Sequence, residues 1–134
     1  LKKGQLKQEI VSRAGEQVLK ETSDQRCERL IKTAPVMLFM KGSPSVPRCK
    51  FSSRVVSALN ASGIEFSHFD ILEDEIVRQA LKTYAQWPTY PQLYVSGTFI
   101  GGCDIIEELH SKGELCQHIT SLLPSKNDAH QKLL

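Results

Sequence analysis

The sequence predicts an α/β fold in which a four-stranded mixed sheet carries helices on both faces. Two observations support this prediction. Short apolar segments of the kind that form buried strands alternate with longer segments of helical periodicity. The last two strand segments are separated only by Ser96-Gly97, a turn that makes them an antiparallel hairpin. This order of elements brings parallel and antiparallel pairs into one sheet.

The N-terminal elements follow from apolar spacing and capping residues. Apolar residues at helical spacing predict an amphipathic helix over residues 5–20, which is either a linker from a preceding domain or an arm packed on the core. Ser23 or Asp24 can cap a second helix that runs to about Thr33. Its expected inner face consists of Cys27, Leu30 and Ile31. The apolar run Val36–Lys41 then predicts a buried strand.

A loop with two prolines and a glycine leads from this strand into the middle of the chain. A helix is expected from Phe51 to Ala61, and a strand over Phe66–Ile71. The acidic cluster Glu73-Asp74-Glu75 opens a further helix that reaches residue 85. The apolar stripe expected for that helix comprises Ile76, Val77, Ala80, Leu81 and Tyr84.

The C-terminal elements complete the sheet and its cover. Gln92–Val95 and Thr98–Ile100 form the predicted hairpin. Asp104 or Cys103 opens a helix through Leu109, and a last helical segment reaches Leu123. The complete arrangement is that of the thioredoxin-like fold. We therefore expect an N-terminal arm or linker over residues 1–22, one domain over 23–123 and a disordered tail over 124–134.

Composition limits the classes of partner. The chain has 134 residues and a net charge of +2, and its basic character lies in the first 33 residues, with eight Lys/Arg against five Asp/Glu. A nucleic-acid face on the core is therefore not expected. No apolar run approaches the length of a membrane span, so we expect no membrane partner. The four cysteines have no framework spacing and are expected to be reduced thiols, with Cys27 and Cys116 in the core.

Cys49 is the strongest candidate for chemistry. It follows a buried strand, a loop and Pro47-Arg48, and it precedes a predicted helix. Free N–H groups and the macrodipole at a helix start favour a thiolate, and Lys41, Arg48 and Lys50 add positive charge. A dithiol redox site would have its second cysteine three residues later, where this chain has Ser52. Cys49 is therefore predicted to be a lone nucleophile or a soft-metal ligand.

Several segments, in order and correctly spaced, resemble the monothiol glutaredoxins, and most closely the glutaredoxin domains of the multidomain PICOT type. The resemblance spans about Asp24 to Leu123. It is carried by Met37–Gly42, Pro47-Arg48-Cys49 with Phe51-Ser52, Asp70-Ile71-Leu72, Val77-Arg78-Gln79, Trp87–Val95 and Gly101–Ile105.

The resemblance implies that glutathione binds beside Cys49. It implies that Lys41 contacts glutathione, that Arg78 binds its glycine carboxylate and that the Tyr90-Pro91 bond is cis. For Lys82 two roles remain: it contacts glutathione, or it is a surface cation. Gly102-Cys103-Asp104 offers helix-start amides and a carboxylate, which suit the charged amino-acid end of glutathione. The expected cofactor-binding residues are Lys41, Arg78, Thr89, Tyr90, Pro91, Gly102, Cys103 and Asp104.

Two functions are compatible with this site. The favoured one, by resemblance, is a carrier of a [2Fe–2S] cluster that bridges two subunits, with both Cys49 thiolates and two glutathione thiolates as ligands. Its partners would be apo iron–sulfur proteins and BolA-like proteins. The alternative is a glutathione-dependent thiol–disulfide oxidoreductase that acts through Cys49, with Cys103 as a resolving thiol. A weaker third interpretation is a docking module without chemistry. The resemblance implies the cytosol or nucleus, with the mitochondrial matrix as the alternative.

Lys50 departs from the family pattern, which has glycine after the reactive cysteine. A lysine adds bulk and charge next to the thiol. It is therefore expected to lower the pKa of Cys49 and, if its side chain enters the shared cavity, to weaken a cluster-bridged dimer.

Overall fold

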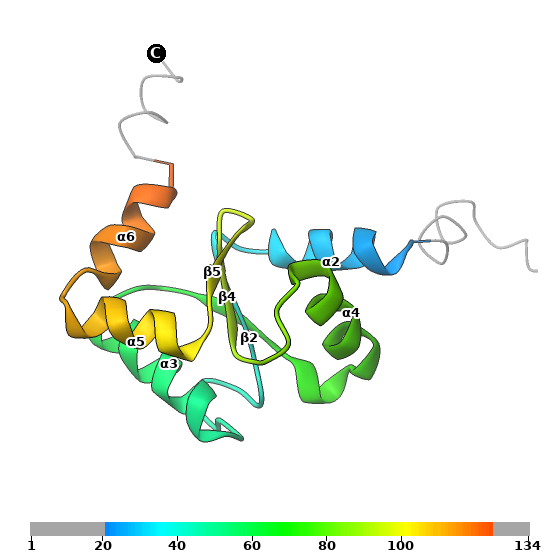
Figure 1. Ribbon diagram of the computed structural model, residues 1–134, viewed down its shortest axis with the longest axis horizontal. Helices are drawn as coiled ribbons and strands as arrows, with labels where there is room; N and C mark the ends of the chain where they lie inside the picture. Colours follow the sequence, from blue (N-terminus) through cyan, green and yellow to red (C-terminus); the bar gives the residue numbers. More distant parts are fainter. Residues whose placement is uncertain (1–20, 125–134) are drawn as a thin grey trace, which may run out of the picture.

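The computed structural model describes residues 21–124. Helices and strands alternate along the chain until the β-hairpin, after which two helices close the fold (Figure 1). The elements are α2 (Ser23–Ile31), β2 (Val36–Met40), α3 (Lys50–Ala61), β3 (Ser67–Asp70), η2 (Ile71–Glu73), α4 (Glu75–Ala85), β4 (Gln92–Val95), β5 (Thr98–Gly101), α5 (Cys103–Ser111) and α6 (Leu115–Leu122).

The four strands form one mixed sheet in the order β3-β2-β4-β5. β2 pairs in parallel with β3, with Met40 opposite Asp70, and antiparallel with β4, with Leu38 opposite Leu93. β4 and β5 form the antiparallel hairpin. The predicted thioredoxin-like sheet is confirmed, and β2 lies in its interior, where all five of its residues are buried.

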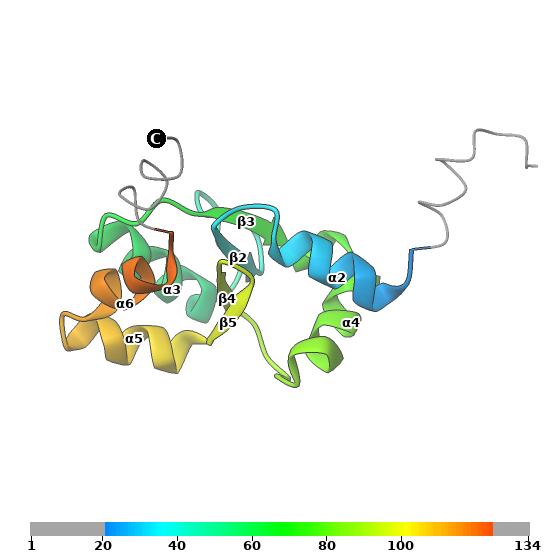
Figure 2. The ribbon, with the colours of Figure 1, turned by 90° about the horizontal axis from the view of Figure 1, so that it is seen from above.

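Each face of the sheet is covered by its own helices. Figures 1 and 2 show α2 and α4 on one side, and α3 and α5 on the other. The side chains of β2 alternate between the two cores, as strand geometry requires. Leu38 and Met40 pack with α3, α5 and α6, whereas Met37 and Phe39 pack with α2 and α4. The carboxyl end of β2 leads directly into the loop that carries Cys49.

The start of α2 differs from the prediction. Its N-cap is Thr22 and not Ser23 or Asp24. The Thr22 hydroxyl accepts a hydrogen bond from the Gln25 N–H at 3.0 Å, and the Gln25 side chain accepts one from the Thr22 N–H at 2.9 Å. This reciprocal pair is a capping box, which satisfies two helix-start donors and so sets the boundary.

The predicted apolar stripe of α4 was partly wrong. Val77 and Leu81 are buried, but Ile76 is 66% exposed and Tyr84 is 37% exposed. Successive residues of a helix point about 100° apart, and in α4 the side that bears Val77 and Leu81 faces the core while Ile76 points away from it. The helix also begins later than predicted, at Glu75, because η2 precedes it and Asp74 is its N-cap.

Cys116 was predicted to lie in the core and is exposed, whereas Cys27 is buried as predicted. α6 directs Leu115 and Ile119 inward, and Cys116 lies on the adjacent face for the same geometric reason as Ile76. Among the described helices, none combines the length and the apolar character that crossing a bilayer requires. The expected helix over 5–20 lies outside the described residues, as does the tail expected over 124–134 apart from its first residue.

Candidate functional site

Cys49 is the N-cap of α3. Its backbone is extended, with φ −156° and ψ 152°, and its sulfur accepts a hydrogen bond from the backbone N–H of Ser52 at 3.3 Å. The sulfur therefore takes the place that a serine or aspartate oxygen takes at an ordinary helix start. The prediction that Cys49 stands at a helix N-terminus is confirmed.

Ser52 contributes a second contact to the same sulfur. Its side chain is fully buried, and its hydroxyl lies 3.5 Å from the Cys49 sulfur. The Ser52 oxygen also accepts a hydrogen bond from the backbone N–H of Lys41 at 3.1 Å. Because that oxygen is already an acceptor, its own hydrogen is free to point at the sulfur once the thiol ionises. Ser52 thus connects the end of β2 to the reactive thiol.

These contacts change the ionisation of Cys49. Partial burial by itself raises the pKa of the thiol, but hydrogen bonds from the Ser52 side chain and from the Ser52 and Phe51 backbone, together with the charge of Lys41, outweigh it. The net result is a pKa below that of an ordinary thiol. Lys41 is the cation among these causes.

A pocket of about 410 Å³ lies beside this thiol. Its size is in the range of small-molecule sites. It brings together seven of the predicted glutathione residues, and Cys49 and Pro91 stand outside its lining. The predicted residues are Lys41, Arg78, Thr89, Tyr90, Gly102, Cys103 and Asp104, and Phe51, Lys82, Trp87, Pro88 and Ile105 complete the wall.

Arg78 enters the pocket with unused hydrogen-bonding capacity. Its Nε is buried without a partner among the described residues, and its nearest carboxylate, Glu75, lies 3.9 Å away. Asp74, four residues before Arg78, forms its ion pair with Arg26 on α2 and not with Arg78. The guanidinium is therefore available to an anion, and Lys82 lines the same pocket.

The side chain of Gln92 anchors the loop before β4 by hydrogen bonds, and the sequence patterns did not identify this residue. Gln92 is fully buried, and its amide donates to the carbonyls of Trp87 at 3.1 Å and Thr89 at 3.2 Å. Its own oxygen accepts from the Tyr94 hydroxyl at 2.9 Å. The Tyr90-Pro91 bond at the end of this loop is cis, as expected. The only signal in the sequence was a polar residue at the start of an otherwise apolar strand.

The loop before Cys49 depends on Gly42 and Asp70. Gly42 has a φ of +91°, and a Cβ there would lie 2.5 Å from the Val46 carbonyl oxygen, so a side chain does not fit. The Asp70 carboxylate accepts from the Gly42 N–H and the Leu72 N–H, both at 2.9 Å. Asp70 at the end of β3 thereby fixes the turn that leads to the thiol.

The start of α5 presents unused amides to the pocket. Gly102 is its N-cap, makes no side-chain capping bond and lies in the pocket wall. A Cβ at this position would come within 3.2 Å of the Pro91 carbonyl oxygen and within 3.1 Å of the Trp87 ring nitrogen. Glycine therefore lets the helix start approach the loop closely, with its N–H groups open to an anion.

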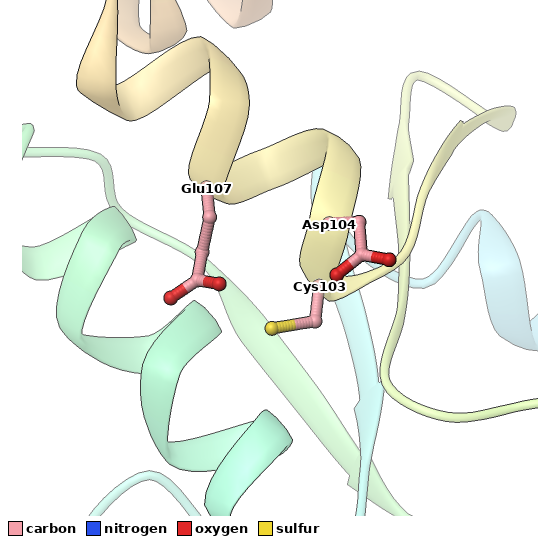
Figure 3. Close-up of side chains that lie close together, drawn as sticks. All are labelled: Cys103, Asp104 and Glu107. Atoms are coloured by element: carbon pink, nitrogen blue, oxygen red, sulfur yellow. The ribbon is translucent and has the colours of Figure 1, made fainter.

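Cys103, Asp104 and Glu107 lie together on α5, with ligand atoms within 4.8 Å of one another (Figure 3). The Cys103 sulfur and the Glu107 carboxylate point into the same space beside α3. Burial, and then the charge of Glu107, raise the pKa of Cys103 to about 11. The thiol is thus neutral near pH 7, which makes it a poor nucleophile. We assign no metal to this group.

Lys50 extends over the neighbouring aromatic ring rather than over the thiol. Its Nζ lies 5.3 Å from the centroid of Phe51, and Lys50 is exposed. It is absent from the lining of the pocket, whereas Phe51 belongs to it. The expected effect of Lys50 on the pKa of Cys49 therefore finds no support in the structure.

A larger hollow of about 1210 Å³ opens elsewhere on the molecule. Glu65 is the one charged residue in its lining, which is otherwise made mostly of apolar groups such as Phe66 and Ile119. It contains no cation to receive a carboxylate, and Cys49 is not part of it. The smaller pocket beside Cys49 is therefore the candidate site.

Comparison with known proteins gives a consistent result. The family model described as Glutaredoxin matches residues 36–100. The chain is 57% identical to Monothiol glutaredoxin-S11 of Oryza sativa over 85% of its own length and 23% of that protein. It is 59% identical to Glutaredoxin 3 of Danio rerio, over 73% of its own length and 30% of that protein. The chain therefore spans about a quarter to a third of the length of these relatives.

Shorter relatives are covered almost completely. Glutaredoxin 4 of Escherichia coli is 47% identical over 73% of this chain and 85% of that protein. The solution structure of reduced apo GrxS14 from poplar superposes with a TM-score of 0.66 and 40% identity, over 78% of this chain and 96% of that one. The similarity thus includes both the fold and the sequence of the described domain.

Proposed function

The chain belongs to the glutaredoxin family, and from this premise we propose that it is a monothiol glutaredoxin that binds glutathione beside Cys49 and carries a subunit-bridging [2Fe–2S] cluster. The proposal rests chiefly on one observation: the lone Cys49 thiol, with its lowered pKa, lies next to residues of a pocket in which the buried Arg78 Nε has no hydrogen-bond partner among the described residues. A thiolate without a second cysteine needs an external thiol to complete its chemistry.

Glutathione suits this pocket because its two charged ends match the two ends of the site. Its glycine carboxylate would pair with Arg78, whose Nε has no partner among the described residues, and with Lys41. Its γ-glutamyl carboxylate would accept from the amides at the start of α5, and its ammonium would pair with Asp104. The glutathione thiol would then lie beside the Cys49 sulfur.

The cluster is the cargo of the proposed carrier. Glutathione and Cys49 together offer only two thiolates per subunit. Two subunits offer four, which is the number that a [2Fe–2S] cluster takes. The lowered pKa of Cys49 favours the thiolate that iron requires. Lys50 does not line the glutathione pocket of the single subunit, so it leaves room there for the glutathione that completes the ligand set.

The partners and compartment belong to the same proposal. The homodimer would form through the cluster, and recipients would be apo iron–sulfur proteins, with BolA-like proteins as further partners. The cytosol or nucleus is proposed as the compartment, with the mitochondrial matrix as the alternative.

Anaerobic reconstitution tests this proposal. The protein is incubated with iron and sulfide, with and without glutathione, and followed by visible absorption and size-exclusion chromatography. The expected result is a glutathione-dependent chromophore that elutes as a dimer, is lost in Cys49→Ser and persists in Cys116→Ser. A monomer without a chromophore would contradict the carrier function, and Lys50→Gly would then test whether Lys50 is responsible.

A second function, reduction of glutathione mixed disulfides, is favoured by the same lowered pKa. The Cys49 thiolate would attack the glutathione sulfur, the S–S bond to the substrate would break, and the substrate would leave as a thiolate that takes a proton from water. A glutathione thiolate would then attack the mixed disulfide on Cys49 and release oxidised glutathione. Cys103 is not needed, and its raised pKa makes it a poor attacking thiol. No turnover of a glutathionylated peptide by accessible, reduced Cys49 would exclude this function.

A further inference from the structure

The entry of α3 carries cations that its own fold does not use. Arg48 and Lys50 flank Cys49, and both are exposed. The N-terminus of a helix has positive partial charge, so cations there are locally unfavourable. α2 and α4 follow the usual rule and have Asp24 and Glu75 in their first turns. Neither α3 nor α6 has an acidic residue there, but α3 alone of these two begins with a cation, Lys50. The charge at this position therefore calls for an explanation outside local stability.

An exposed aromatic ring organises two of these cations. Phe51 is 43% exposed, with Lys50 Nζ at 5.3 Å and Arg54 Cζ at 5.7 Å from its ring centroid. Such contacts hold a cation near the ring and leave its charge unneutralised. Among the described residues, Lys50 has no carboxylate within 4.0 Å, and Arg54 has only Glu107 at 3.9 Å. We call Arg48, Lys50, Phe51 and Arg54 the α3 entry surface.

This surface adjoins the glutathione pocket and shares one residue with it. Phe51 lines the pocket, but Arg48, Lys50 and Arg54 do not. A substrate whose glutathione half fills the pocket must pass its other half outward past Cys49, and Phe51 connects the pocket to the α3 entry surface. The cations thus stand where the non-glutathione half of a mixed disulfide would lie.

We propose that the α3 entry surface binds an acidic segment of the protein whose glutathionylated cysteine reacts at Cys49. This inference rests on the proposed mixed-disulfide chemistry and specifies its substrate class. Asp or Glu residues beside the substrate cysteine pair with Lys50, Arg48 and Arg54, and an apolar neighbour packs on Phe51. Charges at the rim of an interface act mainly on the rate of association and its salt dependence, so selectivity is greatest at low ionic strength.

The test compares glutathionylated peptides that share one cysteine and differ in flanking charge. Transfer of the glutathionyl group to Cys49 is followed by mass spectrometry in single turnover, with a small non-peptide mixed disulfide as a reference for the chemistry. The measured quantity is the ratio of the rates for the acidic and the basic peptide. We expect a ratio of about 10 at low salt that falls towards 1 at high salt, because steering at a charged rim has this order of magnitude.

Variants assign the selectivity to this surface. Lys50→Ala should reduce the ratio severalfold and Lys50→Glu should reverse it, whereas Lys32→Ala removes a cation from the end of α2, on the other face of the sheet, and should leave it unchanged. If the small disulfide transfers its glutathionyl group normally, the chemistry at Cys49 is intact. An equal ratio of peptide rates in wild type and Lys50→Glu then overturns the inference.

Failure of the chemistry is recognised separately. If the small disulfide does not react, the reductase function is wrong, and docking is then measured with a labelled acidic peptide that lacks cysteine. Salt-sensitive binding that Lys50→Glu abolishes supports the α3 entry surface, and no binding overturns it.

Discussion

Replacing Ser52 by alanine should make Cys49 a weaker nucleophile near neutral pH. The substitution removes the hydroxyl that lies 3.5 Å from the Cys49 sulfur and leaves the Ser52 backbone N–H contact at 3.3 Å in place. The Ser52 side chain is one of the causes that lower the pKa of Cys49, so the pKa should rise in the variant. At a pH below that pKa, a smaller fraction of the protein carries the reactive thiolate.

The size of the effect follows from one hydrogen bond to a charged sulfur. A well-formed hydrogen bond to a charged group contributes about 1.5–3 kcal/mol. The long 3.5 Å contact, on a thiol that is only partly buried, places it below that range, at about 1 kcal/mol. Because about 1.4 kcal/mol corresponds to a factor of ten, the alkylation rate near pH 6 should fall about fivefold. The two rates should converge at high pH, where both thiols are ionised.

The assay is the pH dependence of iodoacetamide alkylation at Cys49. It is measured in a Cys116→Ser background, since Cys116 is exposed and would react as well, whereas Cys27 and Cys103 are buried. Ser57→Ala is the matched control, because Ser57 lies exposed on the same helix. Thermal unfolding verifies that the variant is folded, since the Lys41 N–H also loses its acceptor. Identical pH profiles for Ser52→Ala and Ser57→Ala would show that the Ser52 hydroxyl does not stabilise the Cys49 thiolate.

Three further outcomes are expected. Gln92→Leu leaves the carbonyls of Trp87 and Thr89 and the Tyr94 hydroxyl without their buried partner. In urea denaturation the free energy of unfolding should therefore fall by about 3 kcal/mol, against about 1 kcal/mol for Tyr94→Phe. Equal losses in the two variants would contradict the hydrogen-bond network. Arg78→Met should weaken glutathione binding about tenfold in calorimetry, whereas Arg29→Met on α2 should leave it unchanged. γ-Glutamylcysteine lacks the glycine carboxylate, so an equal loss of its binding in Arg78→Met would contradict the pairing of Arg78 with that carboxylate. Asp74 has a lowered pKa because it accepts from the Val77 N–H and pairs with Arg26, so its contribution is complete above the ordinary aspartate pKa and is lost as pH falls through the lowered one. The stability difference between wild type and Asp74→Asn should therefore be on the order of 1 kcal/mol at pH 7 and vanish at low pH, and a difference that persists in acid would contradict it.

The sheet was predictable because its signals are local. β2 is a continuous apolar run whose residues are all buried, and Ser96-Gly97 specifies the hairpin. The position of Cys49 at a helix start could be inferred for the same reason. The burial of individual helix residues was predicted wrongly where an apolar residue lies next in sequence to a more deeply buried one. Ile76 and Cys116 are the two examples.

The site was only partly predictable, because its supporting contacts join distant elements. The Asp70 carboxylate at the end of β3 accepts from the Gly42 N–H beyond the end of β2, and Arg26 on α2 pairs with Asp74 at the start of α4. No spacing rule indicates such pairs. Ser52 illustrates the difference: the sequence identified it as a missing second cysteine, and the structure identifies it as a hydrogen-bond partner of the first.

The most direct test of the account is a crystal structure of the protein with glutathione joined to Cys49 as a mixed disulfide. We expect the glycine carboxylate to lie within hydrogen-bonding distance of Arg78 or Lys41, and the γ-glutamyl end to meet the amides at the start of α5. Glutathione bound outside the pocket beside Cys49, or with its carboxylates turned away from these groups, would contradict it.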